Sequence, residues 1–298
     1  MDVRHLELLR ELADRGSVTA VAAATHRSPS AVSQQLKTAQ RQLGVPLVQP
    51  AGRGLRLTDA GALLAEGGRE VARTVEAVQA RWDDFRGQPA GTVTVAALPS
   101  AAAVLLPGVL RELEGRPIEL ACTDVDLAES DYADLVTDHD LVIAHSLSRA
   151  APAGTDGLAT VELLREPLDI AMRHDHVLTA RSTVRAEDLV DVEWYGVPLG
   201  YPFDTVRLAV EAVTGRPVRV VQRLRDNRLI EALVGDSDRV AVLPRYSTPA
   251  GAGVSLRELS GIPTARYVFA VMRPDRAQRL VVRHVLQTIR GVAAAIRA

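Results

Sequence analysis

Residues 17–43, SVTAVAAATHRSPSAVSQQLKTAQRQL, decide the fold of the first part of this chain. They predict a short alanine-rich helix, a break, and a second helix that begins at Ser28-Pro29-Ser30. Ser28 can cap free backbone N–H groups, and proline fits the first helical position. The second helix then sorts its residues onto two faces at helical spacing. The apolar face is Val32, Leu36, Ala39 and Leu43, and the polar face is Ser30, Ser33, Gln34 and Lys37.

The polar face carries short hydrogen-bonding side chains of the kind that read base edges in a major groove. Ala20, Ala23 and Ala24 in the preceding helix are small enough to let the two helices of a helix-turn-helix pack closely. We therefore interpret residues 17–43 as a DNA-reading helix-turn-helix. An ordinary helical hairpin with a solvated polar face is the alternative, because short motifs also match by chance.

A small β-wing is expected directly after these helices. Gly52-Arg53-Gly54 forms a tight turn between two short apolar stretches, and Arg53 and Arg56 can reach a phosphate or the minor groove. The alternative for Arg53 is a solvated turn arginine. The predicted DNA contacts are Thr19, Arg27, Ser28, Pro29, Ser30, Ser33, Gln34, Lys37, Arg53 and Arg56.

A long helix is predicted from Thr58 to about Gly87, with a sustained 3.5-residue apolar repeat that is typical of a coiled coil. The repeat comprises Leu57, Gly61, Leu64, Gly68, Val71, Val75, Val78, Trp82 and Phe85. Such a helix can pair two DNA-reading heads, and the alternative is a long helix packed on its own domain. The predicted dimerisation residues are Leu64, Val71, Val75, Val78, Trp82 and Phe85.

After a hinge-like linker at 87–91 the pattern changes to alternating strands and helices, which indicates an α/β domain with two lobes. Strands are expected at Thr92–Leu98, Ile118–Val125, Asp140–His145 and Tyr267–Met272, and helices at Ala101–Leu113, 129–137 and Asp275–Arg297.

Composition fits a globular protein of about two domains, with 298 residues, 47% hydrophobic and 24% charged. The single cysteine, Cys122, excludes an internal disulfide, and its apolar surroundings predict a core position. We find no signal peptide or apolar span of about 20 residues and expect a cytoplasmic protein. Residues 1–60 hold eight Lys/Arg and five Asp/Glu within a chain of net charge −2, so the basic charge that attracts DNA lies in the first part.

With these pieces in order, the chain resembles the LysR-type transcriptional regulators over nearly its whole length. The matching motifs are Gly16-Ser17 with Ala22-Ala23, SPSAVSQQLK at 28–37, Leu43-Gly44 with Leu47, Leu57-Thr58 with Ala60-Gly61, AGTVTVAALPSAAAVLLPGVL at 90–110, DLVIAH at 140–145 and RVAVLP at 239–244. The chain departs from the family pattern at Ala39-Gln40 (usually Leu-Glu), at Val48 and Pro50 (usually Phe and Arg), and at 235–238, where the family has a glycine-rich turn.

The resemblance implies a multidomain protein. An N-terminal all-α winged helix-turn-helix would take residues 1–58, a coiled-coil linker and dimerisation helix 59–87, and an α/β two-lobed, periplasmic-binding-protein-like effector domain 88–298. Lobe I would take about 91–160 and 267–298, and lobe II about 161–266. The resemblance also implies a double-stranded DNA operator, a homodimer or homotetramer, a small-molecule effector between the lobes and contact with RNA polymerase, with no enzyme activity, cofactor or membrane.

The strand-to-helix turn at 98–101 is the best candidate for the effector site. A helix N-terminus favours a carboxylate or another anion, and Ser100 adds a hydroxyl; the alternative is that Ser100 only caps the helix. The resemblance places residues from later loops and strand ends near the same site. The predicted effector-binding residues are Pro99, Ser100, Ala101, Asp126, His145 and Phe203.

An enzyme is the alternative of another class. His174-Asp175-His176 would place two histidines on one face of a strand, but a third metal ligand is missing. Gly235-Asp236-Ser237 is similar to hydrolase serine motifs but lacks their Gly-x-Ser-x-Gly elbow. We therefore expect no metal and no catalytic residue. A DNA-binding regulator that has lost ligand sensing is a further alternative, which the atypical loop at 235–238 keeps open.

Overall fold

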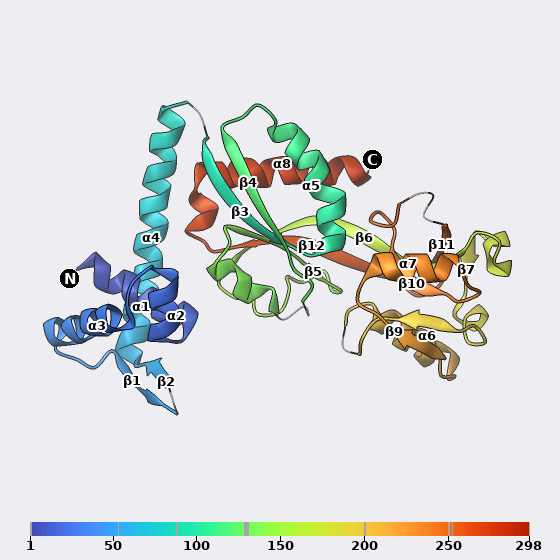
Figure 1. Ribbon diagram of the computed structural model, residues 1–298, viewed down its shortest axis with the longest axis horizontal. Helices are drawn as coiled ribbons and strands as arrows, with labels where there is room; N and C mark the ends of the chain where they lie inside the picture. The colour runs from blue at the N-terminus through green and yellow to red at the C-terminus, as the bar shows by residue number, and fades with distance from the viewer. Residues whose placement is uncertain are drawn as a thin grey trace. The chain divides into compact units, whose positions relative to one another are not determined.

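The computed structural model describes residues 2–52, 54–87, 89–127, 131–199, 201–249, 251 and 253–297. These residues form two compact units (Figure 1). The head unit comprises residues 1–89 with 273–283, and the sheet unit comprises residues 90–272 with 284–298. None of the helices in the described ranges has the length and apolar character that crossing a bilayer requires.

The head unit is a winged helix-turn-helix followed by a long helix. Its elements are α1 (Val3–Arg15), α2 (Val18–Ala24), α3 (Pro29–Leu43), the wing strands β1 (Val48–Ala51) and β2 (Gly54–Leu57), and α4 (Asp59–Phe85). The wing strands pair antiparallel as predicted. One apolar core joins the helices and the wing, and it contains Leu8, Leu9, Leu12, Val21, Ala22, Val32, Leu36, Ala39, Leu47 and Ala65.

The long helix α4 divides into two halves with different surroundings. Thr58 caps it by accepting a hydrogen bond from the Gly61 N–H at 3.1 Å. Gly61 and Gly68 are buried. A Cβ added at Gly61 would lie 2.0 Å from the Leu47 carbonyl oxygen, and one added at Gly68 would lie 2.5 Å from the Leu6 carbonyl oxygen. Leu64 packs against the core of its own unit. The prediction of one free seam along the whole helix is therefore wrong for the first half, because the chain's own backbone covers it.

The sheet unit is built on an eight-stranded sheet of order β4-β3-β5-β12-β6-β11-β7, with β10 also paired to β6. Lobe I contains β3 (Gly91–Ala97), α5 (Pro99–Leu113), β4 (Ile118–Asp124), the 3-10 helix η2 (Ala133–Thr137), β5 (Leu141–Ser146), β12 (Ala265–Met272) and most of α8 (Leu280–Arg297). The short 3-10 helix η5 (Arg276–Gln278) and the start of α8, expected in lobe I, group with the head unit instead. Strand β3 runs parallel to β4 and β5, while β12 runs antiparallel to β5 and β6.

Lobe II follows the second half of the long strand β6 (Ala159–Arg173). The first half of β6 pairs with β12, and its second half pairs with β10 and β11. The remaining elements are η3 (Val177–Ala180), β7 (Thr183–Val184), η4 (Ala186–Asp188), β8 (Trp194–Gly196), α6 (Asp204–Thr214), β9 (Val220–Arg223), α7 (Asn227–Gly235), β10 (Ala241–Pro244) and β11 (Val254–Leu259). Lobe II has a core of its own, from Leu168 to Leu259. Strand β6 therefore links the two lobes.

Three expectations for the sheet unit are corrected. Cys122 is exposed, not in the core, because β4 is an edge strand of the described sheet and its one strand partner there is β3. The helix expected at 129–137 is a 3-10 helix at 133–137, and residues 128–130 lie outside the described ranges. The helix expected from Asp275 begins at Leu280, after the 3-10 turn η5.

Candidate functional site

Helix α3 presents the polar face that its sequence predicts. The Ser28 hydroxyl caps the helix by accepting from the Ala31 N–H at 3.2 Å, Pro29 occupies the first turn, and Gly44 ends the helix with a φ of 73°. Val32, Leu36 and Ala39 are buried in the head-unit core. Ser30, Gln34 and Lys37 are exposed on the opposite side, and Ser33 is half-buried. The face is therefore held by a rigid helix and remains open to a partner.

The other predicted DNA contacts differ in exposure and in whether the side chain is hydrogen-bonded within the protein. Thr19 and Arg27 are exposed, but Arg27 Nη1 donates to Gln35 Oε1 at 2.6 Å. Arg56 faces Gln49 across the wing, and Arg56 Nε and Nη2 each donate at 2.9 Å to the Gln49 amide oxygen when that oxygen is turned toward them. The prediction for Arg53 lies outside the described residues.

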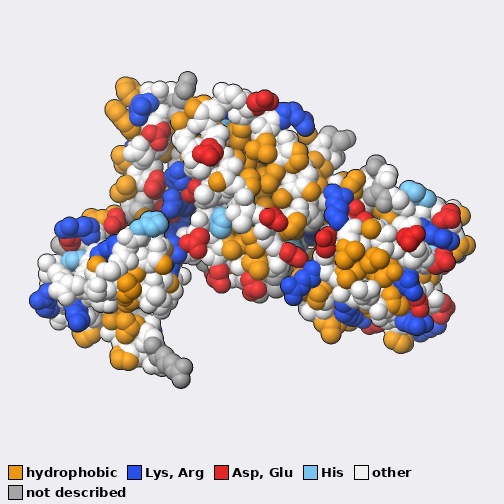
Figure 2. Space-filling view, in the orientation of Figure 1, with side chains coloured by type: hydrophobic (Ala, Val, Ile, Leu, Met, Phe, Trp, Pro, Cys, Tyr) orange, Lys and Arg blue, Asp and Glu red, His pale blue; other side chains and the backbone are white. Residues whose placement is uncertain are grey.

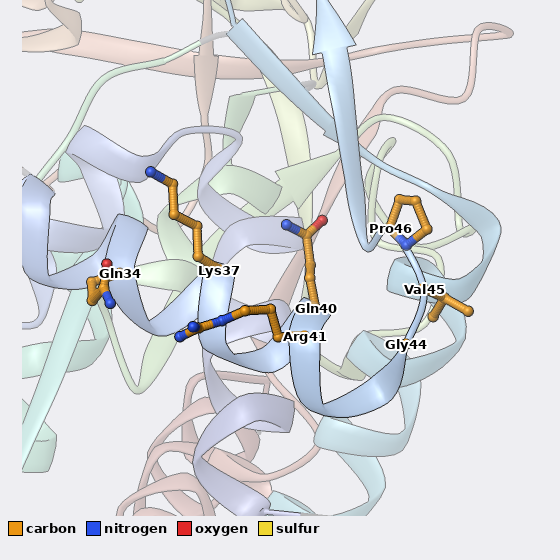
Figure 3. Close-up of a pocket in the computed structure, with 7 residues that line it drawn as sticks. All are labelled: Gln34, Lys37, Gln40, Arg41, Gly44, Val45 and Pro46. Carbon is orange, nitrogen blue, oxygen red and sulfur yellow. The ribbon is translucent and has the colours of Figure 1, made fainter.

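An open groove of about 620 Å³ lies at the end of α3, and Figure 3 shows the side chains that line it. Gln34, Lys37, Gln40 and Arg41 come from α3, and 44–46 come from the loop before the wing. Gln40 Oε1 accepts from the Leu47 N–H at 2.9 Å, so Gln40 joins the end of α3 to the wing. Sequence reasoning missed Arg41, an exposed cation one turn beyond Lys37, although its i+7 spacing from Gln34 gives the signal.

The second half of α4 carries a row of exposed apolar side chains. Val75 is 59% exposed, Val78 51%, Trp82 54% and Phe85 82%. The rings of Trp82 and Phe85 stack with centroids 5.7 Å apart. In Figure 2, apolar side chains lie along this end of the helix. The predicted dimerisation residues beyond Leu64 thus form one exposed stripe, with Val71 half-buried at its start.

In the sheet unit, a buried arginine gathers several of the predicted effector residues. Arg266 on β12 and Glu166 on β6 are directly opposite in the strand register, and both side chains are 1% exposed. Arg266 Nε donates to Glu166 Oε2 at 2.7 Å, Nη1 to Ser100 Oγ at 2.7 Å and Nη2 to Ser247 Oγ at 3.2 Å. The guanidinium also lies 5.7 Å from the ring centroid of Phe203. Ser100 and Phe203, far apart in sequence, therefore meet at one cation.

Glu166 also accepts hydrogen bonds from the loop after β10. Its Oε1 accepts from the backbone N–H groups of Tyr246 and Ser247, each at 2.8 Å, and from the Ser247 hydroxyl at 3.2 Å. These hydrogen bonds, together with the charge pairing, offset the desolvation cost of burying the two ions. We call Arg266, Glu166, Ser100, Ser247 and His145 the Arg266 cluster.

His145 completes the cluster at the end of β5. The residue is 6% exposed, and neither ring nitrogen has a hydrogen-bond partner among the described residues. Burial, aided by the positive charge of Arg266, lowers the pKa of His145 to about 3, so its ring is neutral at ordinary pH. Its ring packs edge-on against Tyr132, with centroids 5.8 Å apart, and burial raises the pKa of that phenol to about 12.

The rim of the cluster is charged and exposed. Asp126 and Arg225 are both exposed, and the Arg225 guanidinium lies 5.3 Å from the ring centroid of the half-buried Tyr201. Partial burial raises the pKa of Asp126, and the charge of Arg225 opposes that rise. Asp126 follows β4 and Arg225 follows β9, so the rim draws on both lobes.

The structure excludes the N-cap interpretation of Ser100, and its effector role stays a prediction. The N-cap of α5 is Leu98, which has no capping side chain, so the view that Ser100 only caps the helix is wrong. Pro99 is exposed at the first turn, and Ala101 is buried. Sequence reasoning missed Arg266 and Glu166. Arg266 is the one charged residue of the otherwise apolar strand β12, which is a signal of a buried, paired charge, whereas Glu166 is one of several charged residues of β6 and has no such signal.

The two enzyme motifs are accounted for by local structure. His174 and His176 lie in the turn after β6, where His174 Nδ1 contacts Ser255 Oγ at 2.9 Å and His176 Nδ1 accepts from the Leu178 N–H at 3.2 Å. They are therefore not on one strand face, and the described residues contain no group of three metal-type ligands. The Ser237 hydroxyl donates to the Leu233 carbonyl at 2.8 Å, at the end of α7.

Two family models match the chain. Residues 3–62 match the bacterial regulatory helix-turn-helix protein, lysR family, and residues 86–294 match the LysR substrate binding domain. A hydrogen peroxide-inducible genes activator of Pectobacterium carotovorum subsp. carotovorum is 26% identical over 63% of this chain and 62% of its own length. A probable RuBisCO transcriptional regulator of Trichormus variabilis is 24% identical over 71% of this chain and 62% of its own length. The matched part thus spans about 62% of these relatives.

Solved structures share the fold of both units. A full-length OxyR variant of Pseudomonas aeruginosa superposes with a TM-score of 0.67 at 20% identity, covering 100% of this chain and 95% of that one. Full-length CbnR complexed with its target DNA superposes with a TM-score of 0.54 at 19% identity, covering 98% of this chain and 100% of that one. On the family models and on the fold, this chain belongs to the lysR family of bacterial regulatory helix-turn-helix proteins.

Proposed function

We propose that this chain is a sequence-specific transcriptional regulator that binds double-stranded operator DNA and responds to a small effector held at the Arg266 cluster. The observation that carries the DNA part is the polar face of α3, which is exposed on a capped helix whose other face is buried. Polar side chains on such a helix suit the donor and acceptor pattern of a major groove. The solved CbnR structure with its target DNA supports this assignment.

The proposal assigns roles by chemistry. Ser30, Ser33 and Gln34 read base edges, Lys37 and Arg41 neutralise phosphates beside them, and Arg56 steadies the wing through Gln49. Two copies joined through α4 would place two recognition helices about 34 Å apart, so each operator holds two half-sites. Effector binding then changes the assembly or the bending of the DNA, and thereby the access of RNA polymerase, through different affinities for two states.

We propose that the response to the effector does not involve an intrachain disulfide. Several of the relatives are named as hydrogen peroxide-inducible genes activators. This chain has one cysteine and cannot form a disulfide within itself. That cysteine, Cys122, is on the edge strand β4 and is not part of the Arg266 cluster. Sensing therefore depends on the polar groups of the cluster. A regulator without any effector is the remaining alternative.

Selection of the full-length chain on a random DNA pool at about 150 mM salt tests the DNA part. We expect an enriched site with two half-sites about one helical turn, or a multiple of a turn, apart. We expect that site to bind at least about 1,000-fold more tightly than bulk DNA. Uniform binding to all sequences would refute the proposal.

The dimer part is tested by placing charges on the exposed half of α4. Val75→Asp with Val78→Asp should raise the dimer dissociation constant at least about 100-fold, because carboxylates would enter an apolar interface. Light scattering after size-exclusion chromatography measures the change. Leu63→Asp is the matched control, since Leu63 is 74% exposed on the same helix but outside the seam. An unchanged dimer in the double variant would contradict the role of this stripe.

A further inference from the structure

The Arg266 cluster is electrically balanced in this structure. The Arg266 guanidinium is paired with the Glu166 carboxylate, and both side chains are 1% exposed. The only other titratable member of the cluster, His145, is neutral. An anion that entered would bring a net charge into a buried place where the one cation is already compensated, and such a charge is strongly disfavoured.

The hydrogen-bonding groups that remain free in the cluster are of both kinds. Ser100 Oγ accepts from Arg266 Nη1, so the proton of Ser100 is available to donate elsewhere. A neutral imidazole has one donor nitrogen and one acceptor nitrogen, and both ring nitrogens of His145 lack partners among the described residues. His145 is only 6% exposed, and buried polar groups normally have hydrogen-bond partners. The two unpartnered ring nitrogens therefore point to a polar ligand.

We propose that the Arg266 cluster binds an uncharged ligand carrying a hydroxyl or a primary amide, and that it selects against the corresponding carboxylate. Such a group donates to the acceptor nitrogen of His145, and its oxygen accepts from the Ser100 hydroxyl. A carboxylate only accepts, so it leaves the acceptor nitrogen of His145 unmet and adds an unbalanced charge. This rests on the proposed function, and it replaces the anionic effector that the helix N-terminus of α5 alone suggests.

Matched pairs of probes test the charge preference in the full-length chain. Benzamide with benzoate, acetamide with acetate, and succinamide with succinate differ within each pair in charge while keeping nearly the same shape. Calorimetry at pH 7.5 should show at least one amide binding ~10-fold or more tightly than its carboxylate. Glu166→Gln removes the balancing charge with little change of shape, and this variant should reverse that order. Glu187→Gln, which alters an exposed glutamate of lobe II, is the matched control and should keep it.

Replacing His145 by leucine should weaken the amide ~10-fold or more, whereas His174→Leu, at an exposed histidine outside the cluster, should leave its affinity as in the wild type. A wild-type chain that prefers the carboxylates, or that binds no probe, would overturn the proposal. The wild-type pairs decide this even where a variant fails to fold. Operator binding is measured on the same preparations. Loss of sequence-specific DNA binding would refute the proposed function and leave the ranking of the probes intact.

Discussion

The polar face of α3 and the Arg266 cluster are both polar sites, but they are assembled in different ways. The α3 face lies within residues 30–37, and helical periodicity alone separates it from the buried residues between its members. The Arg266 cluster draws on positions 100, 145, 166, 247 and 266, which the pairing of β12 with β6 and the ends of β3 and β5 bring together. A local pattern thus predicts an exposed surface, whereas a buried polar cluster requires the topology of the sheet.

The largest expected effect follows from removing the cation of the cluster. Arg266→Ala leaves Glu166 buried without its partner, and we expect the free energy of unfolding of the sheet unit to fall by about 3–5 kcal/mol. Urea unfolding at pH 7.5 measures it. Arg225→Ala, at an exposed arginine on the rim, should cost less than about 1 kcal/mol. Equal decreases in the free energy of unfolding of the two variants would contradict a buried, structurally important ion pair at Arg266.

The head unit also depends on contacts between residues far apart in sequence. Two adjacent glycines of α4, Gly67 and Gly68, provide a test of these contacts. A Cβ at Gly68 would lie 2.5 Å from the Leu6 carbonyl oxygen, whereas one at Gly67 meets nothing within 4 Å. We expect Gly68→Ala to lower the free energy of unfolding by about 1–3 kcal/mol through overpacking. Gly67→Ala should raise it by up to about 1 kcal/mol through helix propensity. Thermal unfolding of the two variants side by side measures both, and shifts of the same sign would contradict the close packing of α1 on α4.

For the α3 face the expected effect is on binding and not on folding. Gln34→Ala should remove about 1–3 kcal/mol of discrimination at one base pair of the operator, if that base is read directly. Lys37→Ala should instead weaken all sequences alike and lower the salt dependence by about one counterion. Both side chains are exposed, so unfolding should change by less than about 0.5 kcal/mol. Competition with single-base operator variants over a salt series separates the two roles.

The smallest expected effect is a pH dependence from His145. Its pKa is lowered to about 3 in the folded chain, while an unfolded histidine titrates near 6.5. The unfolded state therefore takes up the proton first as the pH falls, and stability is lost below about pH 6.5. We expect a loss of about 1 kcal/mol from this residue between pH 7.5 and pH 6. Urea unfolding at both values should show a smaller loss in His145→Gln, while His174→Gln should behave like the wild type; equal losses in all three would contradict a buried neutral ring.

The sequence predicts this molecule well where neighbours along the chain determine the structure. The capping by Ser28, the pairing of the wing strands and the start of α4 after Thr58 were all predictable, because each depends on residues close in sequence. The fold class also follows from strand and helix alternation. Of the candidate effector site, Ser100 and Phe203 were predicted and do meet, but at Arg266, a cation that was not predicted.

The errors share one physical cause, which is that burial depends on what the rest of the chain covers. Cys122 has apolar neighbours in sequence but lies on an uncovered edge strand. Leu64 fits the heptad repeat but is used by the core of its own unit. In each case the apolar pattern predicted the secondary structure correctly but did not show which part of the chain, if any, covers the side chain.

The exposed position of Cys122 has a practical consequence. Because it is the chain's only cysteine, a thiol-reactive spin label or dye attaches at one defined point of the natural sequence. Partial burial raises the pKa of this thiol, so labelling is best carried out at a mildly alkaline pH, where more thiolate is present. Two labelled copies then carry a single pair of probes, and the distance between them, measured with and without operator DNA or an amide probe, reports the arrangement of the assembly directly.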